Sequence, residues 1–335
     1  MNYHPLVRAV SMAMRQHGRL PHNPHLLVAV SGGADSTALL RVLAMLAPRR
    51  DWGLTLTVGH VHHHLHNQAD AHADFVAKLA GDLGLASLRR DVHVQQHLDR
   101  HSGNVENAAR LLRYAALESM AHECGADAVA VAHHGDDQLE TLLMRLARGS
   151  GPRGLRGLRW RRALTEDSQV ALVRPMLAAD RAMVLDFLTH AGQDFVDDPT
   201  NADACRDRAR LRAEVTPAIR AIWPKASRNA TQVAEQVAQQ HEAVTAAARE
   251  IHWRRNAQGD RSAMRSQLRL LPRAAVVEAL RRAGAPAGRT LEDAAAAALD
   301  RKGGQRVFEF PAGLQLLIDR ERVTLKKKIA TDERG

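Results

Sequence analysis

Residues 27–40 read Leu27-Val28-Ala29-Val30-Ser31-Gly32-Gly33-Ala34-Asp35-Ser36-Thr37-Ala38-Leu39-Leu40 and join three local patterns. The four residues at the start are apolar, two of them valines, which is typical of a short buried strand. Two glycines, an acid and two hydroxyl residues follow, and a helical apolar pattern then runs until Pro48. This order of strand, glycine-rich turn and helix predicts an anion site, because the free N–H groups and the positive dipole end of the helix point at the turn.

The residues of the turn narrow the kind of anion. Gly32 and Gly33 can adopt positive φ and let the backbone approach a phosphate, and Asp35 beside a phosphate implies a bridging Mg²⁺. The turn has neither the Gly-Lys-Ser/Thr ending of a Walker A loop nor the Gly-x-Gly-x-x-Gly pattern. Its Ser-Gly-Gly-x-Asp-Ser form resembles the PP-loop of ATP pyrophosphatases, which adenylate a substrate and release pyrophosphate. An ordinary capped turn is the alternative, which we favour less because all six positions match.

Composition excludes several classes of protein. The 335 residues are enough for two domains. No stretch approaches the ~20 apolar residues of a membrane span, and residues 1–19 lack the apolar core of a signal peptide. Cys124 and Cys205 are isolated, so the sequence indicates no disulfide framework and no zinc or iron–sulfur site. We therefore expect a cytoplasmic protein with no membrane partner.

The positive charge is concentrated in the C-terminal part of the chain. Residues 1–200 carry 21 Lys and Arg against 21 Asp and Glu, whereas residues 201–335 carry 26 against 16. A basic part beside a neutral nucleotide-binding part favours a polyanionic partner. Charge alone leaves open a basic surface that serves only solubility. Aromatic residues are 3% of the chain, which argues against extensive base stacking on aromatic side chains.

Strands and helices alternate through the first part of the chain. After the first strand, the predicted strands span 54–61, 88–94, 126–132 and 170–173. Helices are predicted over 5–17, 68–83, 105–123, from 137, and over 181–191, 226–253, 262–283 and 290–301, with small strands over 307–325. Strands separated by helices of this length indicate βαβ units in an open parallel sheet. Ligands of such sheets bind at the carboxyl ends of the strands, where 31–36, 60–66 and 133–137 all lie.

A run of histidines follows the predicted strand 54–61. Its members are His60, His62, His63, His64 and His66. Such a run suggests a metal, but strand-end histidines without a carboxylate or cysteine in register more often line a cleft. We therefore favour a polar cleft lining over a metal site.

Two helical clusters have two interpretations each. Asp137, Glu140 and Thr141 share one helix face, where the two carboxylates could receive an ammonium group or could simply be the acids that a first helical turn favours. Arg110 and Arg113 lie near Glu106 on another helix. They could hold a phosphate or could pair with Glu106 on a solvated face, and spacing does not separate these possibilities.

The stretch 145–162 and the region beyond it are basic. Residues 145–162 hold seven arginines, four glycines and no acid, which is typical of a flexible cationic loop that contacts phosphates. Pro217 and Pro224 indicate a domain boundary. We expect a catalytic domain over 1–224, a basic helical domain with small strands over 225–325, and a polar tail over 326–335.

Taken together, these motifs resemble the tRNA(Ile)-lysidine synthetase family. The matching segments are Ser31–Ser36, His60–His63, Ala109–Tyr114, Ala132–Thr141, Arg148–Leu155, Arg174–Leu177 and Asp198–Asn201. The resemblance covers roughly residues 25–224, and 225–325 are only loosely similar to the family's first C-terminal domain. This similarity implies that 225–325 serve tRNA recognition. We expect the further C-terminal domain of longer members to be absent. The implied fold is an α/β PP-loop domain (adenine nucleotide alpha hydrolase-like, Rossmann-like) with a smaller, mainly helical C-terminal domain.

The resemblance implies a ligase that forms a carbon–nitrogen bond. ATP adenylates the C2 oxygen of the wobble cytidine in tRNA(Ile) with a CAU anticodon, and pyrophosphate leaves. Free L-lysine then displaces AMP through its ε-amine and gives lysidine, which changes codon reading from AUG to AUA. Members of the family are often homodimers.

The resemblance also implies roles for individual residues. Asp35 would hold Mg²⁺, and Arg110 or Arg113, together with Arg208, would neutralise charge around the α-phosphate. The lysine substrate would be held by Asp137 and Glu140. ATP would be bound by Ser31, Gly32, Gly33, Ala34, Asp35, Ser36, His60 and His133. The tRNA backbone would be contacted by Arg148, Arg153, Arg156, Arg206 and Arg212.

The chain departs from the family pattern near Arg208 and after the paired histidines. Ala209 follows Arg208 where the family commonly has Asn, and His64 stands where Gly is common.

A PP-loop tRNA thiolase would need more cysteines than Cys124 and Cys205. A non-catalytic tRNA-binding protein with a relic ATP site is disfavoured by the intact acids Asp35, Asp137 and Glu140.

Overall fold

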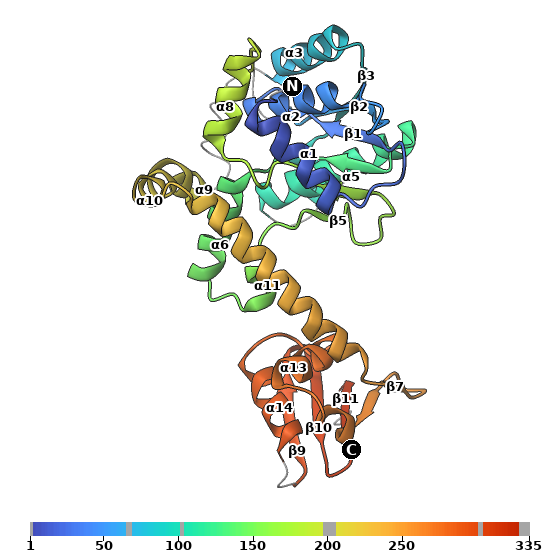
Figure 1. The fold of residues 1–335 in the computed structure, drawn as a ribbon. Helices are drawn as coiled ribbons and strands as arrows, with labels where there is room; N and C mark the ends of the chain where they lie inside the picture. Colours follow the sequence, from blue (N-terminus) through green and yellow to red (C-terminus); the bar gives the residue numbers. More distant parts are fainter. Residues whose placement is uncertain (1–2, 65–68, 101–103, 197–205, 301–303, 328–335) are drawn as a thin grey trace. The chain divides into compact units, whose positions relative to one another are not determined.

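The computed structural model describes the chain except residues 1–2, 65–68, 101–103, 197–205, 301–303 and 328–335 (Figure 1). The chain divides into two compact units, 1–236 and 237–335. Helix α11 (Ala226–Arg249) contributes residues to both. The assignment of 225–325 to tRNA recognition stays a prediction. His66, Cys205 and the segment Asp197–Asn201 lie outside the described residues.

A six-stranded sheet forms the centre of the first unit. Its strands are β1 (His25–Ala29), β2 (Thr55–His62), β3 (Ala86–Asp91), β4 (Ala128–Ala130), β5 (Arg161–Ala163) and β6 (Ala171–Val173). Their order is β3-β2-β1-β4-β6-β5, and all neighbours are parallel except β5 and β6. Because the order reverses between β1 and β4, the turns that follow these two strands meet at a switch point, where open α/β sheets bind ligands. The predicted α/β class is confirmed.

Helices cover both faces of this sheet. Leu26 and Val28 of β1 face one core, which α1 (Pro5–His17), α2 (Ala34–Leu46), α3 (Ala69–Asp82) and α8 (Arg181–His190) complete. Leu27 faces the other core, against α5 (Val105–Cys124). Successive strand residues point to opposite faces, so a continuous apolar run such as that of β1 is what a sheet buried on both sides requires.

The predicted strand 88–94 is shifted in the structure. The strand β3 covers Ala86–Asp91, and α4 (Val94–Arg100) begins where the prediction ended. The predicted flexible loop 145–162 contains a short helix, α7 (Pro152–Leu155), and reaches the edge strand β5. Arg145 donates to the Gly154 and Gly157 carbonyls and so ties this segment to α6 (Gly135–Ala147).

The segments that follow the sheet pack around α6. These are α9 (Arg206–Arg210), the π-helix η2 (Leu211–Val215) and α10 (Thr216–Ile222). Leu139 and Leu142 of α6 pack on Ala230 and Ala234 of α11 in a small apolar cluster. Within the part of the chain that the structure describes, no helix is long and apolar enough to cross a membrane.

The second unit contains an antiparallel sheet in the order β7-β8-β11-β10-β9. Its strands are β7 (Arg254–Arg255), β8 (Arg261–Met264), β9 (Arg306–Phe310), β10 (Leu314–Ile318) and β11 (Arg322–Lys327), so the first two residues of the predicted tail belong to a strand. Helices α13 (Arg273–Arg282) and α14 (Arg289–Leu299) pack against it.

The predicted helix 262–283 is correct over α13 but wrong at its start. Its first residues form β8, which pairs with β11, and α12 (Arg265–Leu268) and a turn at Pro272 separate β8 from α13. Proline has no N–H to donate within a helix, and here it stands at the N-cap of α13. Pairing with a strand some sixty residues away in the sequence overrides the local helical pattern.

Candidate functional site

The turn at 31–36 connects β1 to the N-terminus of α2. Gly32 has φ +95°, a left-handed conformation that a side chain disfavours. The Ser36 hydroxyl accepts from the Ser31 N–H at 3.2 Å and donates to the Gly33 carbonyl at 3.0 Å, which fixes the turn. Gly33 is the N-cap and offers no side-chain cap, so the first amides of α2 are left for an anion. The predicted strand, turn and helix are therefore present, with positive φ at Gly32 but not at Gly33, and the binding of an anion there stays a prediction.

Asp35, in the first turn of α2, faces two cationic partners. Arg181 Nη1 donates to Asp35 Oδ1 at 2.5 Å, and His134 Nε2 lies 3.6 Å from the same oxygen. Burial raises the pKa of Asp35, but His134 and Arg181 outweigh it and bring the pKa below its ordinary value. The carboxylate is thus ionised at neutral pH and can act as an oxygen ligand.

His134 connects the turn to α6. Its Nδ1 accepts from the Asp136 N–H at 3.3 Å, and Asp137 accepts from the His134 N–H at 2.9 Å, which closes a capping box. Its Nε2 lies 3.7 Å from Asp137 Oδ2 as well as near Asp35. Burial lowers the pKa of His134, but Asp137, Asp35 and Asp136 together raise it to about 9. A second proton on the ring therefore competes with the cap hydrogen bond at Nδ1.

Asp136, beside this ring, accepts hydrogen bonds from three other segments of the chain. It accepts from the Arg181 N–H at 2.9 Å, from Arg220 Nη1 at 3.3 Å and from the Ser227 hydroxyl. These contacts join the starts of α6, α8 and α11 around one buried carboxylate. Asp136 consequently holds its neighbour Asp137 in place.

Asp137 and Glu140 form a buried acid pair on α6. Arg208 donates to Glu140 at 3.0 Å and to Asp137 at 2.9 Å. Arg212 donates to Glu140 at 3.1 Å and to Asp137 at 2.8 Å. Burial raises the pKa of Asp137, but His134 and the two arginines bring it well below the ordinary value. Arg208 and Arg212, predicted to contact phosphate and tRNA, are thus the partners of the predicted lysine site.

The two other predicted ATP ligands lie at strand ends. His60 Nδ1 lies 2.8 Å from the Val30 carbonyl, directly before the turn, and burial lowers its pKa. His133 Nδ1 accepts from Arg174 Nε at 3.3 Å, and burial together with Arg174 lowers its pKa well below the ordinary value. Both rings are neutral at neutral pH. They lie at the carboxyl ends of the strands, as the turn at 31–36 does.

An arginine cluster surrounds Tyr114 on α5. The guanidinium groups of Arg110, Arg113 and Arg162 lie 5.5, 5.4 and 4.9 Å from the ring centroid. Burial raises the pKa of Tyr114, but these arginines and Arg174 lower it to about 8. Burial lowers the pKa of Arg174 to about 10. So much positive charge around one phenol indicates a place for an anion.

A cavity of about 570 Å³ opens beside this cluster. Its described lining has no carboxylate, and the arginines in it are Arg110, Arg145, Arg153, Arg156, Arg159, Arg162 and Arg174. It brings together two of the predicted tRNA ligands, Arg153 and Arg156, with one of the predicted phosphate ligands, Arg110. Arg113 lies on the Tyr114 side of the cluster and is not among the cavity-lining residues.

The remaining predicted residues lie apart or are not described. Arg148 is exposed at the end of α6, 3.7 Å from Asp207. Arg206 begins α9, but its side chain lies outside the described part of the chain, as does that of Glu106. Sequence reasoning gave no role to Arg181. Its only local signal is its position after the N-cap Asp180, which says nothing of its contact with Asp35.

The sheet order, the turn at its switch point and the ionised Asp35 define a PP-loop nucleotide-binding protein, and a model of the PP-loop domain matches residues 6–219. A tRNA(Ile)-lysidine synthase of Alkalilimnicola ehrlichii is 42% identical over 213 residues, which are 63% of this chain and 45% of that protein. The one of Salinispora tropica is 41% identical over 239 residues, 70% of this chain and 68% of that protein. The chain belongs to the tRNA(Ile)-lysidine synthase family, as the motifs predicted.

The similarity extends over part of the relatives' length and, at the level of fold, to a solved structure. The chain spans about half the length of several of the curated relatives it matches and about two thirds of others. Among solved structures, the U34-tRNA thiolase NcsA from Methanococcus maripaludis has a TM-score of 0.58 at 16% identity, covering 69% of this chain and 78% of that one. This second likeness is one of fold.

Proposed function

We propose that the protein is a tRNA(Ile)-lysidine synthase that acts in the cytoplasm. The observation that carries the proposal is the position of His134, whose Nε2 faces both Asp35 of the turn and Asp137 of the acid pair. This position would put a site for the nucleotide phosphates beside a site for an ammonium group. Membership of the family supports the same assignment.

The proposed reaction has two steps. The C2 oxygen of the wobble cytidine in a CAU anticodon attacks the α-phosphorus of ATP, and the bond to pyrophosphate breaks. The neutral ε-amine of free lysine then attacks C2 and gives up a proton, and the C2–O bond breaks to release AMP. The net result is a ligase reaction that forms a carbon–nitrogen bond.

The turn at 31–36 and Asp35 would serve the first step. Amides at the start of α2 would bind the phosphates, and Gly32 keeps the backbone close to them. Asp35 fits a Mg²⁺ ligand, because it is an ionised carboxylate that is 28% exposed beside the phosphate cradle. When bound, Mg²⁺ would neutralise charge on the departing pyrophosphate.

The acid pair would serve the second step. Glu140 is 1% exposed, and a buried carboxylate without a cationic partner is costly by several kcal/mol. When a guanidinium group leaves the acid pair, an ammonium group of lysine would therefore take its place. Arg208 and Arg212 would hold the acids in place until lysine arrives, and a released guanidinium would then be free to approach the α-phosphate.

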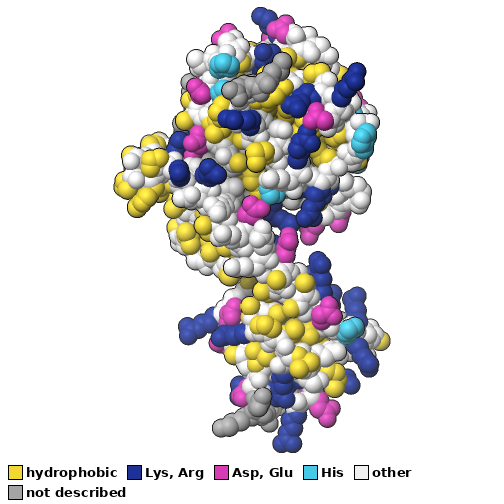
Figure 2. Space-filling model, in the orientation of Figure 1, with side chains coloured by type: hydrophobic (Ala, Val, Ile, Leu, Met, Phe, Trp, Pro, Cys, Tyr) yellow, Lys and Arg dark blue, Asp and Glu magenta, His cyan; other side chains and the backbone are white. Residues whose placement is uncertain are grey.

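The arginine cavity would bind the tRNA. Its seven guanidinium groups suit backbone phosphates, and the excess of basic residues beyond residue 200 adds to the attraction. On the face drawn in Figure 2, Lys and Arg side chains lie over both units, with Asp and Glu among them. A tRNA thiolase is less well supported, because two cysteines in the whole sequence are too few to carry sulfur or a cluster.

The test is incubation of the protein with ATP, Mg²⁺, labelled lysine and a tRNA(Ile) transcript that has a CAU anticodon. We expect label in the tRNA together with AMP and pyrophosphate. The matched control is the methionine tRNA, which has the same anticodon and should stay unlabelled. Incorporation of sulfur or ammonia in place of lysine would refute the proposal.

A further inference from the structure

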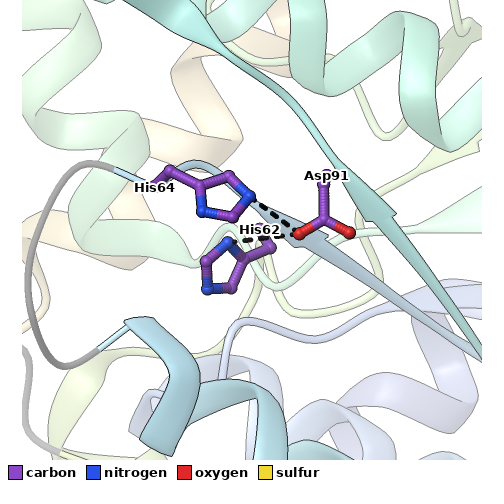
Figure 3. Close-up of side chains that lie close together, drawn as sticks. All are labelled: His62, His64 and Asp91. Carbon is purple, nitrogen blue, oxygen red and sulfur yellow. Dashed lines mark hydrogen bonds and ion pairs between the residues drawn. The ribbon is translucent and has the colours of Figure 1, made fainter.

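The ends of β2 and β3 bring together His62, His64 and Asp91, which none of the roles above uses (Figure 3). Asp91 Oδ1 lies 2.8 Å from His64 Nε2 and 3.5 Å from His62 Nδ1. The strand register pairs His62 directly with Asp91. The premise that no carboxylate stands in register with the histidine run is therefore wrong, and with it the reason to set a metal aside.

His62 is the member of this cluster whose ring nitrogens are buried without a hydrogen bond. Its side chain is 2% exposed, and within the described part of the chain neither ring nitrogen makes a hydrogen bond. Asp70 and Asp91 lie near the two nitrogens, but off the hydrogen-bonding direction. Burying a polar group unpaired is unfavourable. An imidazole nitrogen that makes no hydrogen bond can donate its lone pair to a metal.

We propose that His62, His64 and Asp91 bind a zinc ion. Two imidazoles and a carboxylate form a donor set that Zn²⁺ accepts readily, with water as a fourth ligand. Zinc bonds of about 2.0 Å at tetrahedral angles place ligand atoms roughly 3.3 Å apart. The two separations from Asp91 Oδ1, 2.8 and 3.5 Å, lie on either side of that value.

Asp70 and Arg89 lie beside the proposed zinc ligands and would affect zinc binding. Asp70 Oδ1 lies 3.2 Å from His62 Nε2 without a hydrogen bond, and a small rotation of its exposed side chain would let it accept the proton of this nitrogen, as carboxylates beside zinc-bound histidines do. Arg89 donates to Asp91 Oδ1 at 2.9 Å and so competes with the metal for this oxygen. The ion would replace this guanidinium and join β2 to the edge strand β3.

The test uses the full chain without an affinity tag, stripped of metal by a chelator. Zn²⁺ is titrated by calorimetry, and Co²⁺ by the visible absorption of its tetrahedral complexes. We expect one site per chain that also raises the melting temperature. His64→Gly and Asp91→Ala should each weaken binding by more than about tenfold, whereas Arg89→Gln should tighten it.

The variants are chosen so that the protein stays folded. His64 and Asp91 are both more than two-fifths exposed, and His64 has φ +52°, where glycine is less strained. His22→Ala, an exposed histidine elsewhere, is the matched control for adventitious binding among the 19 histidines. Equal zinc affinity in the wild-type and His64→Gly chains would overturn the proposal. The measurement needs neither ATP nor tRNA, so its result is independent of the proposed reaction.

Discussion

The residues Asp137 and Glu140 show how the meaning of a carboxylate depends on distant parts of the chain. Their spacing on one helix face was predictable from the sequence. Their partners were not, because Arg208 and Arg212 follow 68 to 75 residues later and no local pattern links them to α6. The sequence could therefore predict an ammonium site, but not that two guanidinium groups already fill it.

Single substitutions at Glu140 and Asp35 should separate the two steps of the reaction. Glu140→Gln should raise the lysine KM by about 10- to 100-fold, because a charged hydrogen bond is worth roughly 1.5–3 kcal/mol. ATP–pyrophosphate exchange in the presence of tRNA should remain detectable in it. Asp35→Asn should abolish that exchange, and Asp51→Asn, an exposed acid, is its control. Unchanged lysine dependence in Glu140→Gln would remove the role given to this helix face.

Acid should destabilise the first unit partly through Asp137. Its folded pKa is below the unfolded value of about 3.9, so its stabilising contribution is complete above that pH and is lost as pH falls toward the folded pKa. Urea unfolding of the wild type between pH 5 and 2 should lose on the order of 2 kcal/mol more than Asp137→Asn does. Parallel pH profiles of the two proteins would contradict this prediction.

Helices and strands that depend only on residues adjacent in the sequence could be predicted from the sequence. The strand β1, the turn after it and the start of α2 follow from apolar residues and glycines that lie side by side in the sequence. The pairing of β3 with β2 and the conversion of 262–264 into β8 depend on register with other strands, which periodicity within one segment does not encode. The cluster of His62, His64 and Asp91 and the strand β8 were not predicted for this same reason.

The short helix α12 depends on one buried arginine. Arg265 donates to the carbonyls of Ala297, Ala298, Asp300 and Asp319. Lysine cannot reproduce this planar fork, so Arg265→Lys should destabilise the second unit by about 2–4 kcal/mol. The control is the exposed Arg269, which donates one hydrogen bond to the Asp300 carbonyl. Arg269→Lys should lower the free energy of unfolding by less than about 1 kcal/mol. Thermal unfolding of both variants measures the difference, and equal losses would refute the role of the fork.

For the whole molecule, charge rather than shape should dominate tRNA affinity. The chain carries a formal net charge of +10, and release of counterions makes such binding fall steeply with salt. Filter binding at several salt concentrations should give a log–log slope that Arg156→Gln, in the arginine cavity, lowers by about one. Arg8→Gln, on an exposed face of α1, should leave the slope unchanged. Equal slopes in the two variants would exclude the cavity from tRNA binding.

The position of His134 should couple the binding of Mg²⁺-ATP to the binding of lysine. Because one ring faces Asp35 and Asp137, a charge that arrives at either carboxylate changes the electrostatic environment of the other. Coupling of this kind is reciprocal: whatever factor Mg²⁺-ATP applies to the affinity for lysine, lysine must apply to the affinity for Mg²⁺-ATP. Calorimetry with a non-hydrolysable ATP analogue should return the same factor in both directions. His134→Gln should bring that factor toward one, and the two substrates would then bind without regard to each other.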